Sequence, residues 1–441
     1  MKYIYGLNKS GQSIINYLNL IKENYYCWDN NEGTRNKLIK LDRNINLVKP
    51  ENINLQLIDE LFVTPGVSLN NNNLSFFKNN NIKLYRDLEL YSRISRDKKI
   101  IAITGTNGKS TTTKLVSDIL KKSKIKNFKG GNIGIPLLEF TKKNNEIEHH
   151  VIELSSFQLE AFDDFNPFIS ILLNIVPDHL DRYKNYEDYA FQKEKLIISS
   201  KNNFNIVCID YQKNFEIFNK YKKKIIPISK KYLKHGIYYK DNYIIDNYFK
   251  IKKNIKLSLL SPSLFGAFNI ENIMAAYVVA RILNIETKDF IHVLAKFKGL
   301  SHRLENIYQD KKLQVINNSK ATNLFATLKA ISNYENIYLI LGGRPKEKNF
   351  KPILNYNKKI TKIYLIGEST EIIFKQLKKI IVCEKCENIE IATKKILFDI
   401  KGKKISKTVL FSPACSSFDQ FVNFEQRGNF FKKTMIKHLN V

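Results

Sequence analysis

Residues 101–114, IAITGTNGKSTTTK, restrict the possible fold of this chain more than any other stretch. An apolar strand leads through a glycine-containing turn into a helix with apolar residues at Leu115, Val116 and Ile119. The backbone amides of such a turn and helix start form a nest for an anion, and Lys109 adds a positive charge. This strand, turn and helix therefore predict a parallel α/β domain with a nucleotide phosphate at the turn.

The turn is a shortened form of the usual phosphate loop. The strict pattern places its first glycine five residues before the glycine of the Gly-Lys pair, and that position is Ile103 here. Gly105 follows two residues later, and Ser110 or Thr111 supplies a hydroxyl for Mg²⁺. The alternative is a glycine-rich turn without a ligand.

Composition sets the outer limits of the interpretation. A chain of 441 residues exceeds one hydrophobic core and predicts about three domains. No apolar run approaches the ~20 residues of a membrane span, and the first residues enter a strand without a signal-peptide core, so we expect a cytoplasmic protein. The five cysteines are scattered, and the CEKC at 383–386 lacks a second metal-binding pair, which indicates free thiols.

The formal charge of +30 is a feature that many nucleic-acid-binding proteins share. The lysines are spread evenly among many Asn and Ile residues, however, and arginine is scarce. No RNA-binding aromatic signature, zinc finger or basic helix stands out. A basic nucleic-acid-binding ATPase therefore remains only an alternative, and we expect no nucleic-acid partner.

Apolar strands alternate with helix-length segments along the whole chain, as in α/β proteins. The expected strands lie at 2–5, 25–28, 100–104, 168–176, 313–317, 337–343, 362–367 and 408–413. The charged stretch 95–100 and the change from helix to strand over 296–307 indicate linkers. We therefore predict three domains, at residues 1–97, 98–298 and 299–441.

The first strand is followed by GLNKSG and a helix, and the second strand ends at Asp29. This order is similar to the dinucleotide-binding G-x-G-x-x-G layout, in which an acid takes a ribose hydroxyl. The middle glycine is replaced by Asn8, which argues against close passage of a pyrophosphate. Ordinary packing of a strand, a turn and a helix explains the same residues equally well.

Two further polar groups follow apolar strands. VIELSSFQLE (151–160) places Glu153 at a strand end, where a carboxylate beside a phosphate loop suits Mg²⁺. NIVPDHLDRY (174–183) places His179 beside the same expected crevice, as a ligand or as a structural histidine. A nucleophilic serine is not expected, because no G-x-S-x-G elbow is present.

Together the motifs resemble those of the Mur ligases and follow the same order. They are GTNGKSTTTK, GGNIG (130–134), ELSSFQLE, DHLDRY, FNIEN (268–272), GLSHRLE (299–305) and SPACSSFDQFVNFEQRGNFF (412–431). The resemblance covers essentially the whole chain. It implies a Rossmann-like N-terminal domain, a central P-loop-type ATPase domain and a Rossmann-like C-terminal domain.

Within that family, NSKATN (318–323) and FEQRGN resemble the members that add D-glutamate, and the D-N-P-R motif of the diaminopimelate-adding members is absent. The resemblance implies an ATP- and Mg²⁺-dependent ligase that joins D-glutamate to UDP-N-acetylmuramoyl-L-alanine through an acyl phosphate, in peptidoglycan synthesis. It also implies a monomer with small-molecule partners. A sister amide ligase of the folylpolyglutamate type remains the alternative, although FEQRGN argues against it.

The resemblance also implies roles for individual residues by matched position. The implied catalytic residues are Lys109, Glu153, His179, Lys193, Lys320 and Lys346. The implied metal ligands are Ser110, Glu153, His179 and Lys193, the last as an N-carbamate. The implied ATP contacts are Gly105, Thr106, Asn107, Gly108, Lys109, Ser110, Thr111, Asn269, Arg303 and Asn318. The implied substrate contacts are Ser10, Asp29, Asn30 and Gly66 for the uridine diphosphate, and otherwise Asn132, Ser155, Gln158, Thr322, Lys346, Ser417, Phe418 and Phe424.

Lys193 lies four residues after Tyr189, which matches the carbamate position better than its nearest rival, Lys195. The SPACSS turn (412–417) is expected to open a helix whose amides bind a carboxylate. The chain departs from the family pattern at Asn318 in place of Asp, at Phe268 in place of His, at Asn8-Lys9 and at Arg344-Pro345. None of these departures removes a group assigned to the chemical step.

Overall fold

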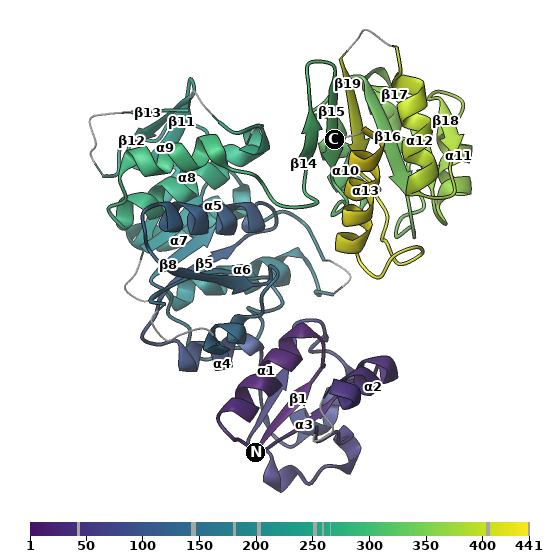
Figure 1. Ribbon diagram of the computed structural model, residues 1–441. Helices are drawn as coiled ribbons and strands as arrows, with labels where there is room; N and C mark the ends of the chain where they lie inside the picture. Colours follow the sequence, from purple (N-terminus) through teal and green to yellow (C-terminus); the bar gives the residue numbers. More distant parts are fainter. Residues whose placement is uncertain are drawn as a thin grey trace. The chain divides into compact units, whose positions relative to one another are not determined.

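The computed structural model describes residues 1–41, 45–142, 147–179, 182–200, 204–249, 254–257, 260–264, 266–402 and 406–439. The chain divides into two compact units, residues 1–259 with 267–295 and residues 260–266 with 296–441. The described strands form three sheets, two in the first unit and one in the second (Figure 1). Each unit is an α/β structure built mainly on parallel strands.

The first sheet has the strand order β2-β1-β3-β4, and all its described pairings are parallel. Its elements are β1 (Lys2–Tyr5), α1 (Lys9–Leu20), β2 (Tyr25–Trp28), α2 (Glu32–Leu41), β3 (Glu60–Val63), α3 (Ser75–Asn79), β4 (Lys83–Tyr85) and α4 (Asp87–Ile94). The two glycines of GLNKSG serve close packing. A Cβ on Gly6 would lie 2.1 Å from Thr64 Oγ1, and one on Gly11 would lie 2.0 Å from the Gly6 carbonyl oxygen. These glycines are therefore required by the strand, turn and helix themselves, whether or not a nucleotide binds there.

The second sheet has nine strands in the order β13-β12-β11-β10-β9-β8-β5-β7-β6. Its strands are β5 (Lys99–Thr104), β6 (Asn127–Gly131), β7 (His149–Glu153), β8 (Ile169–Leu172), β9 (Phe204–Cys208), β10 (Ile225–Ser229), β11 (Ile237–Lys240), β12 (Tyr243–Asp246) and β13 (Ile255–Lys256). Its helices are α5 (Lys109–Lys122), α6 (Tyr186–Ser199), α7 (Gln212–Tyr221), α8 (Ala267–Ile282) and α9 (Thr287–Lys296).

The strand order of this sheet reverses between β5 and β8. From β5 the chain proceeds through α5 to β6 and β7 on one side, and from β8 it proceeds through α6 to β9 on the other. Because parallel crossovers are right-handed, α5 and α6 lie on opposite faces of the sheet. The loops after β5 and β8 therefore border the crevice at the switch point, where α/β proteins bind ligands.

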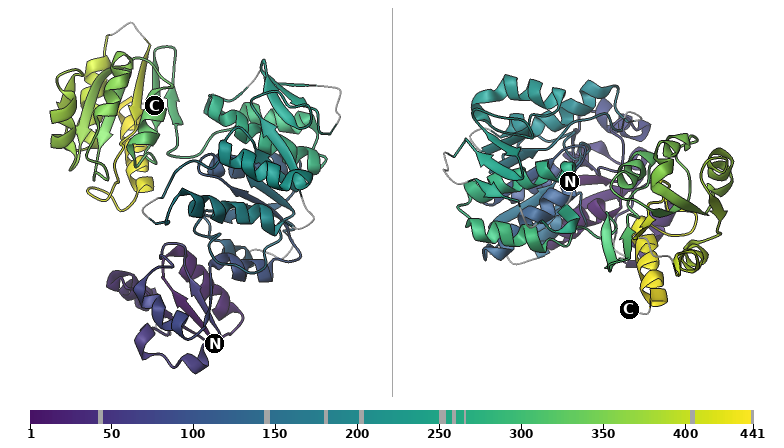
Figure 2. Two further views of the ribbon diagram at one scale, coloured as in Figure 1. Left: turned by 180° about the vertical axis from the view of Figure 1, so that it is seen from behind. Right: turned by 90° about the horizontal axis from the view of Figure 1, so that it is seen from above.

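The third sheet, in the second unit, has the order β14-β15-β19-β16-β17-β18. Its elements are β14 (Glu305–Gln309), β15 (Leu313–Asn317), α10 (Leu324–Ile331), β16 (Ile337–Gly342), β17 (Ile360–Ile366), α11 (Thr370–Leu377), β18 (Cys383–Lys385), α12 (Ile389–Ile400), β19 (Lys407–Phe411) and α13 (Phe424–Leu439). Strand β14 is antiparallel to β15, whereas the other described pairs are parallel. Apolar side chains cover both faces of this sheet. Figure 2 shows the ribbon of the chain from two further directions.

The expected strand at 168–176 is wrong in length. Strand β8 ends at Leu172, because the carbonyl of Asn174 accepts the amide of Thr106 at 2.7 Å rather than continuing a sheet ladder. The sequence interpretation also did not name β3, β4, β6, β9 to β14 or β18, which are strands of only two to five residues.

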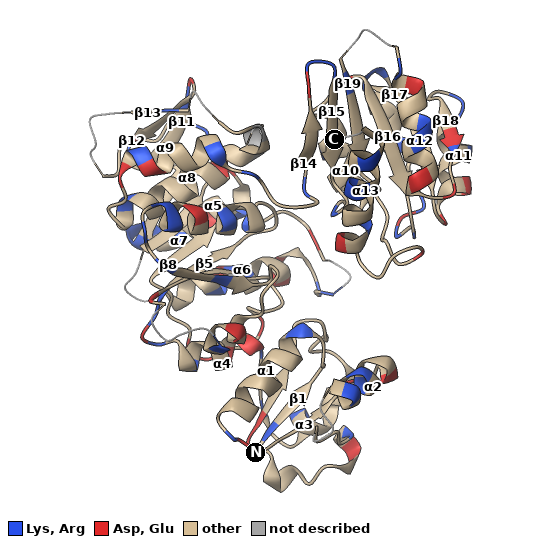
Figure 3. Ribbon diagram, viewed as in Figure 1, with Lys and Arg blue, Asp and Glu red and all other residues tan. Residues whose placement is uncertain are grey.

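Surface composition agrees with the even spread of charge along the sequence. Figure 3 shows Lys and Arg on helices and loops of both units, with Asp and Glu among them. All five cysteines are free thiols. Among the described residues, no helix combines the length and the apolar character that a membrane crossing needs.

Two arginines hold the loop after β3, which carries Gly66. The buried Arg86 guanidinium donates to the carbonyls of Val63 at 2.9 Å and Thr64 at 2.7 Å, and it pairs with Glu160. Arg182 donates to the carbonyl of Pro65 at 2.8 Å and lies 3.2 Å from the same Glu160 carboxylate. Burial lowers the pKa of Arg86, and the adjacent Glu160 carboxylate opposes that shift. Both charges are therefore buried but paired.

We predict that Arg86→Met destabilises the fold by about 3–5 kcal/mol, because it leaves a buried carboxylate and several carbonyls without their partner. The matched control is Arg96→Met, which removes an exposed arginine that lies 3.9 Å from Asp164. This control should change stability by about 1 kcal/mol or less. Urea unfolding of both variants measures the difference, and equal effects would contradict the argument.

Candidate functional site

The phosphate loop lies at the switch point of the second sheet. Gly105 and Gly108 have φ angles of +149° and +86°, which other residues rarely adopt. A Cβ on Gly108 would lie 2.3 Å from Asn272 Oδ1 on α8, so only glycine fits between the loop and that helix. The hydroxyl of Ser110, in the first turn of α5, is buried at the same end.

Asn174, just after β8, fixes the shape of this loop from the other side of the switch point. Its Oδ1 accepts the amide of Asn107 at 2.7 Å, and its Nδ2 donates to the carbonyl of Asn107 at 3.2 Å. Its backbone carbonyl accepts the amide of Thr106 at 2.7 Å. Three hydrogen bonds from one residue thus hold the turn. Because the amides of Thr106 and Asn107 already donate to Asn174, an anion would bind the amides that follow Asn107.

Two lysines approach the loop. Lys109 Nζ donates to the carbonyls of Gly105 at 2.7 Å and Thr106 at 2.9 Å. Lys193, on α6, is almost fully buried and donates to the same Gly105 carbonyl at 3.0 Å. Burial, followed by the ammonium of Lys109, holds the pKa of the Lys193 amine well below that of an exposed lysine. The Lys193 amine therefore loses its proton at a lower pH than an ordinary lysine does, and it is nucleophilic there.

Glu153 ends β7, next to β5 in the sheet. Its Oε1 accepts the Asn132 side-chain amide at 2.8 Å, whereas its buried Oε2 has no hydrogen-bond partner among the described residues. The GGN turn lies against this strand end, since a Cβ on Gly131 would be 2.2 Å from the Glu153 carbonyl oxygen. An unpartnered buried carboxylate oxygen costs free energy, and a hard cation is a partner that such an oxygen accepts.

His179 lies in the loop after β8 with a φ angle of +53°. Its ring is half-exposed, its Nε2 lies 3.6 Å from Asp178 Oδ2, and its centroid lies 4.8 Å from that of Phe157. The ring of Tyr189 lies 6.5 Å from the His179 ring and 4.9 Å from Lys193 Nζ. His179 and Lys193 thus flank one aromatic ring near the phosphate loop.

Ser155 and Gln158 form a reciprocal pair after β7. The Ser155 amide donates to Gln158 Oε1 at 3.2 Å, and the Gln158 amide donates to Ser155 Oγ at 3.2 Å. Gln158 Nε2 also donates to the buried Asp87 at 3.4 Å. Burial raises the pKa of Asp87. The pair therefore shapes the turn, in which Ser155 is partly exposed.

The start of α8 contributes amide side chains to the loop. Asn272 Oδ1 accepts the Thr112 hydroxyl at 3.0 Å, and Asn272 Nδ2 donates to the buried Asn269 at 2.9 Å. The FNIEN motif thus meets the phosphate-loop helix through Asn272. The side chain of Phe268, one of the departures from the family pattern, lies outside the described residues.

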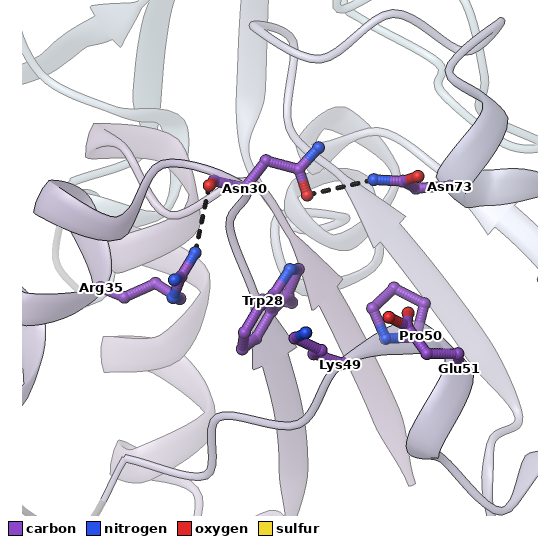
Figure 4. Close-up of a pocket in the computed structure, with 7 residues that line it drawn as sticks. All are labelled: Trp28, Asn30, Arg35, Lys49, Pro50, Glu51 and Asn73. Carbon is purple, nitrogen blue, oxygen red and sulfur yellow. Dashed lines mark hydrogen bonds between the residues drawn. The ribbon is translucent and has the colours of Figure 1, made fainter.

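A pocket of about 280 Å³ opens beside the carboxyl end of β2 (Figure 4). Asn30 Oδ1 on its wall accepts the Tyr5 hydroxyl at 2.7 Å and the Asn73 amide at 3.1 Å. The Trp28 ring faces the Arg35 guanidinium, whose carbon lies 4.3 Å from the ring centroid. The pocket therefore offers amide, cationic and aromatic groups. The full lining is Trp28, Asn30, Arg35, Lys49, Pro50, Glu51 and Asn73.

Asp29 and the other residues implied in uridine binding have separate environments. The Asp29 carboxylate accepts the amides of Leu7 at 2.7 Å and Asn31 at 2.9 Å, so it fixes the loop after β2. Gly66 is exposed, and a Cβ there would meet nothing within 4 Å. Ser10 is half-buried in the first turn of α1.

In the second unit, residues from three motifs lie together. Asn318 Nδ2 donates to Ser412 Oγ at 3.0 Å, and its Oδ1 accepts the amide of Leu304 at 3.2 Å. Lys320 Nζ lies 5.4 Å from the centre of the Phe424 ring. The NSKATN, GLSHRLE and FEQRGN motifs thus meet at the carboxyl ends of β15 and β19. Arg303 and Thr322 are half-buried in the same motifs, and Lys346 is exposed after β16.

Arg427 organises this region, although the sequence interpretation assigned it no role. It is buried and donates to the Ser319 hydroxyl at 3.1 Å, the Ser319 carbonyl at 2.8 Å and the Cys415 carbonyl at 3.0 Å. Burial lowers its pKa to about 10. The arginine of FEQRGN is therefore a structural link between the NSKATN and SPACSS segments.

The expectation that SPACSS opens a helix is wrong. The carbonyl of Ser417 accepts the amides of Gln420 at 3.2 Å and Phe421 at 2.8 Å, which closes a single turn. The helix α13 begins only at Phe424. Ser417 is buried and Phe418 is exposed, so the two residues of this turn point to different environments.

Comparisons with known proteins identify similar sequences. Residues 103–280 match a family model described as the Mur ligase middle domain. The UDP-N-acetylmuramoylalanine--D-glutamate ligase of Rickettsia bellii is 36% identical over 97% of this chain and 95% of its own length. The enzyme of the same name from Wolbachia pipientis is 32% identical over 97% of this chain and 94% of its own length.

Solved structures of low sequence identity share the fold. The UDP-N-acetylmuramate-alanine ligase MurC of Thermotoga maritima aligns over 100% of this chain and 99% of its own, with a TM-score of 0.59 and 18% identity. MurF ligase from Thermotoga maritima, determined in complex with ADP, aligns over 92% of each chain with a TM-score of 0.58 and 16% identity.

Proposed function

This chain belongs to the Mur ligase family, and from that membership we propose that it is a UDP-N-acetylmuramoyl-L-alanine:D-glutamate ligase. The observation that carries the proposal is the 36% identity with a ligase of that name over 97% of the chain. The reaction is an ATP-dependent amide synthesis in peptidoglycan construction. A folylpolyglutamate-type ligase is not favoured.

The chemistry runs through an acyl phosphate. The γ-phosphoryl group of ATP passes to the terminal carboxylate of UDP-N-acetylmuramoyl-L-alanine, and ADP leaves. The amine of D-glutamate then attacks the activated carbonyl carbon, inorganic phosphate departs, and the amine loses a proton. Activation is needed because a carboxylate at neutral pH is a poor electrophile and lacks a good leaving group.

The residues of the switch point support specific roles in this reaction. The loop and Lys109 hold the ATP phosphates, and Asn269 contributes at the start of α8. Glu153, with its unpartnered Oε2, and Ser110 fit a Mg²⁺ ion, which would neutralise phosphate charge. His179 and a Lys193 carbamate would complete a second cation site. Asn132, Ser155 and Gln158 hold the muramyl part.

The remaining roles fall in the first and third sheets. The pocket beside Asn30, with Ser10, Asp29 and Gly66, receives the uridine diphosphate. The third sheet provides Arg303 and Asn318 for the nucleotide. Lys320, Thr322 and Lys346 approach the transferred phosphate or the incoming glutamate, and Ser417, Phe418 and Phe424 hold the glutamate. We assign the three sheets to three domains, at residues 1–97, 98–298 and 299–441, of a cytoplasmic monomer.

Phosphate release from ATP tests the proposal directly. We expect release only when UDP-N-acetylmuramoyl-L-alanine and D-glutamate are both present, together with one new amide product by mass spectrometry. Addition of DNA or RNA should change nothing. Turnover with a folate and glutamate, or turnover stimulated by nucleic acid, would replace the proposal with one of its alternatives.

Glu153→Gln should reduce Mg²⁺-dependent ATP turnover about 10²-fold or more, the scale of losing one electrostatic contact to a transition state. The substitution keeps the shape of the side chain and the Asn132 contact but removes the charge. Glu148→Gln is the matched control, because Glu148 lies beside the other end of β7 and pairs with Lys99 on the surface. Unchanged turnover in Glu153→Gln at ordinary Mg²⁺ would remove Glu153 from the metal site.

Lys193→Arg should abolish ligation while ATP still binds. Carbamate formation requires a neutral amine, the form that burial favours at Lys193, and arginine keeps its charge and cannot react with CO₂. Wild-type activity should also fall when CO₂ is depleted. Lys195→Arg is the matched control, since Lys195 donates to the carbonyl of Glu160 at 2.8 Å. Near-normal ligation by Lys193→Arg would exclude the carbamate.

A further inference from the structure

A buried carboxylate on α8 is linked to the phosphate loop through one side chain, Asn174. Glu271 is only 2% exposed and makes three hydrogen bonds with groups from three different segments. Its Oε1 accepts the Tyr211 hydroxyl at 2.7 Å and the Lys230 ammonium at 2.6 Å. Its Oε2 accepts Asn174 Nδ2 at 3.3 Å. The two carboxylate oxygens thus have different partners.

The contact with Glu271 supports the same orientation of the Asn174 amide that its hydrogen bonds with Asn107 require. The amide of Asn107 needs an acceptor, which Asn174 Oδ1 provides at 2.7 Å. An ionised Glu271 is an acceptor only, so it requires Asn174 Nδ2 on its side. A flipped Asn174 amide would place a donor against the Asn107 amide and an acceptor against Glu271. Glu271 therefore stabilises the one orientation that holds the loop.

The other two partners hold the Glu271 carboxylate in place. Lys230 lies in ion-pair distance of Glu271 and, at 3.9 Å, of Asp210. Burial would lower the pKa of Lys230, but the hydrogen bond with Glu271 raises it overall. Burial and the adjacent Glu271 raise the pKa of the Tyr211 hydroxyl, so it remains a donor. Oε1 therefore accepts hydrogen bonds from Tyr211 and Lys230, and Oε2 accepts one from Asn174.

We propose that Glu271 is a positioning residue for nucleotide binding, which acts through Asn174 on Thr106 and Asn107 of the phosphate loop. The proposal rests on the proposed ATP-dependent function, because it takes this loop as the ATP phosphate site. It predicts that loss of the Glu271–Asn174 contact weakens ATP binding without removing any group that touches ATP. The contact raises the affinity for ATP because it holds the loop in its binding conformation before ATP arrives.

Glu271→Gln isolates this contact. Tyr211 and Lys230 are both donors, so they require the oxygen of the new amide, and its nitrogen then faces Asn174 Nδ2. Two donors cannot bond, so the Asn174 amide loses the support that Glu271 gives to its orientation. We expect the affinity for MgATP, measured by calorimetry on the full chain, to fall at least tenfold. The KM for D-glutamate should stay within about twofold.

Tyr211→Phe is the matched control, because it removes a hydrogen bond to Oε1 and leaves the Asn174 contact intact. It should keep MgATP affinity within threefold of wild type, even where thermal unfolding shows that it destabilises the protein as much as Glu271→Gln does. A purely structural role of Glu271 would make the two variants equal in both measurements.

Asn174→Ala completes a double-mutant cycle. If Glu271 acts through Asn174, the double variant Glu271→Gln/Asn174→Ala binds MgATP as weakly as Asn174→Ala alone. Additive losses, or wild-type affinity in Glu271→Gln, would overturn the proposal. If Glu271→Gln does not fold, wild-type affinity in Asn174→Ala would overturn it. A wild-type protein that fails to bind MgATP would refute the proposed function instead.

Discussion

The reversal of strand order between β5 and β8 is the constraint on which the candidate site depends. Because the chain leaves these neighbouring strands in opposite directions, the loops that follow them part and leave a crevice at the carboxyl edge of the sheet. The phosphate loop follows β5, and the segment with Asn174 and His179 follows β8. Glu153 reaches the same edge from β7, the other neighbour of β5. Three motifs separated by tens of residues thus converge at this edge, where Asn174 also bonds directly to Asn107 of the phosphate loop.

Burial of charged and polar groups is the recurring means by which this framework is fixed. Arg86 holds the loop after β3, Glu271 holds Asn174 behind the phosphate loop, and Arg427 joins two segments of the third sheet. Each of these groups is almost fully buried and has several hydrogen-bond partners: mainly backbone carbonyls for the two arginines, and a hydroxyl, an ammonium and an amide for Glu271. Displacing the partners of such a buried group costs free energy. The group therefore stabilises the one loop conformation that supplies those partners. Glu153 and Lys193 differ from them. Glu153 has one oxygen without a hydrogen-bond partner among the described residues, and burial lowers the pKa of Lys193.

The local sequence was sufficient to predict secondary structure where a long apolar strand or a motif determines the backbone within a few residues. Strand β5, the phosphate loop and helix α5 were predictable, because glycine conformations and apolar periodicity are local properties. The same holds for β1, β2 and β16. The predicted helix after SPACSS failed, because hydrogen bonds from Gln420 and Phe421 to Ser417 close a turn that apolar periodicity does not encode. The strand at 168–176 was cut short by the bond between Asn174 and Thr106, two residues that lie far apart in the sequence.

The sequence by itself determined the α/β class, the phosphate loop and the family, because these are recorded in residue types and their order along the chain. Only the tertiary structure decided what Arg86, Asn174, Glu271 and Arg427 do. Their partners come from remote segments, so the local sequence does not show which groups they bond. It also decided that Glu153 Oε2 lacks a partner and that Lys193 is buried, since desolvation depends on everything that packs around a group. Composition alone would place Lys193 on the surface. Its buried position beside the loop instead lowers its pKa.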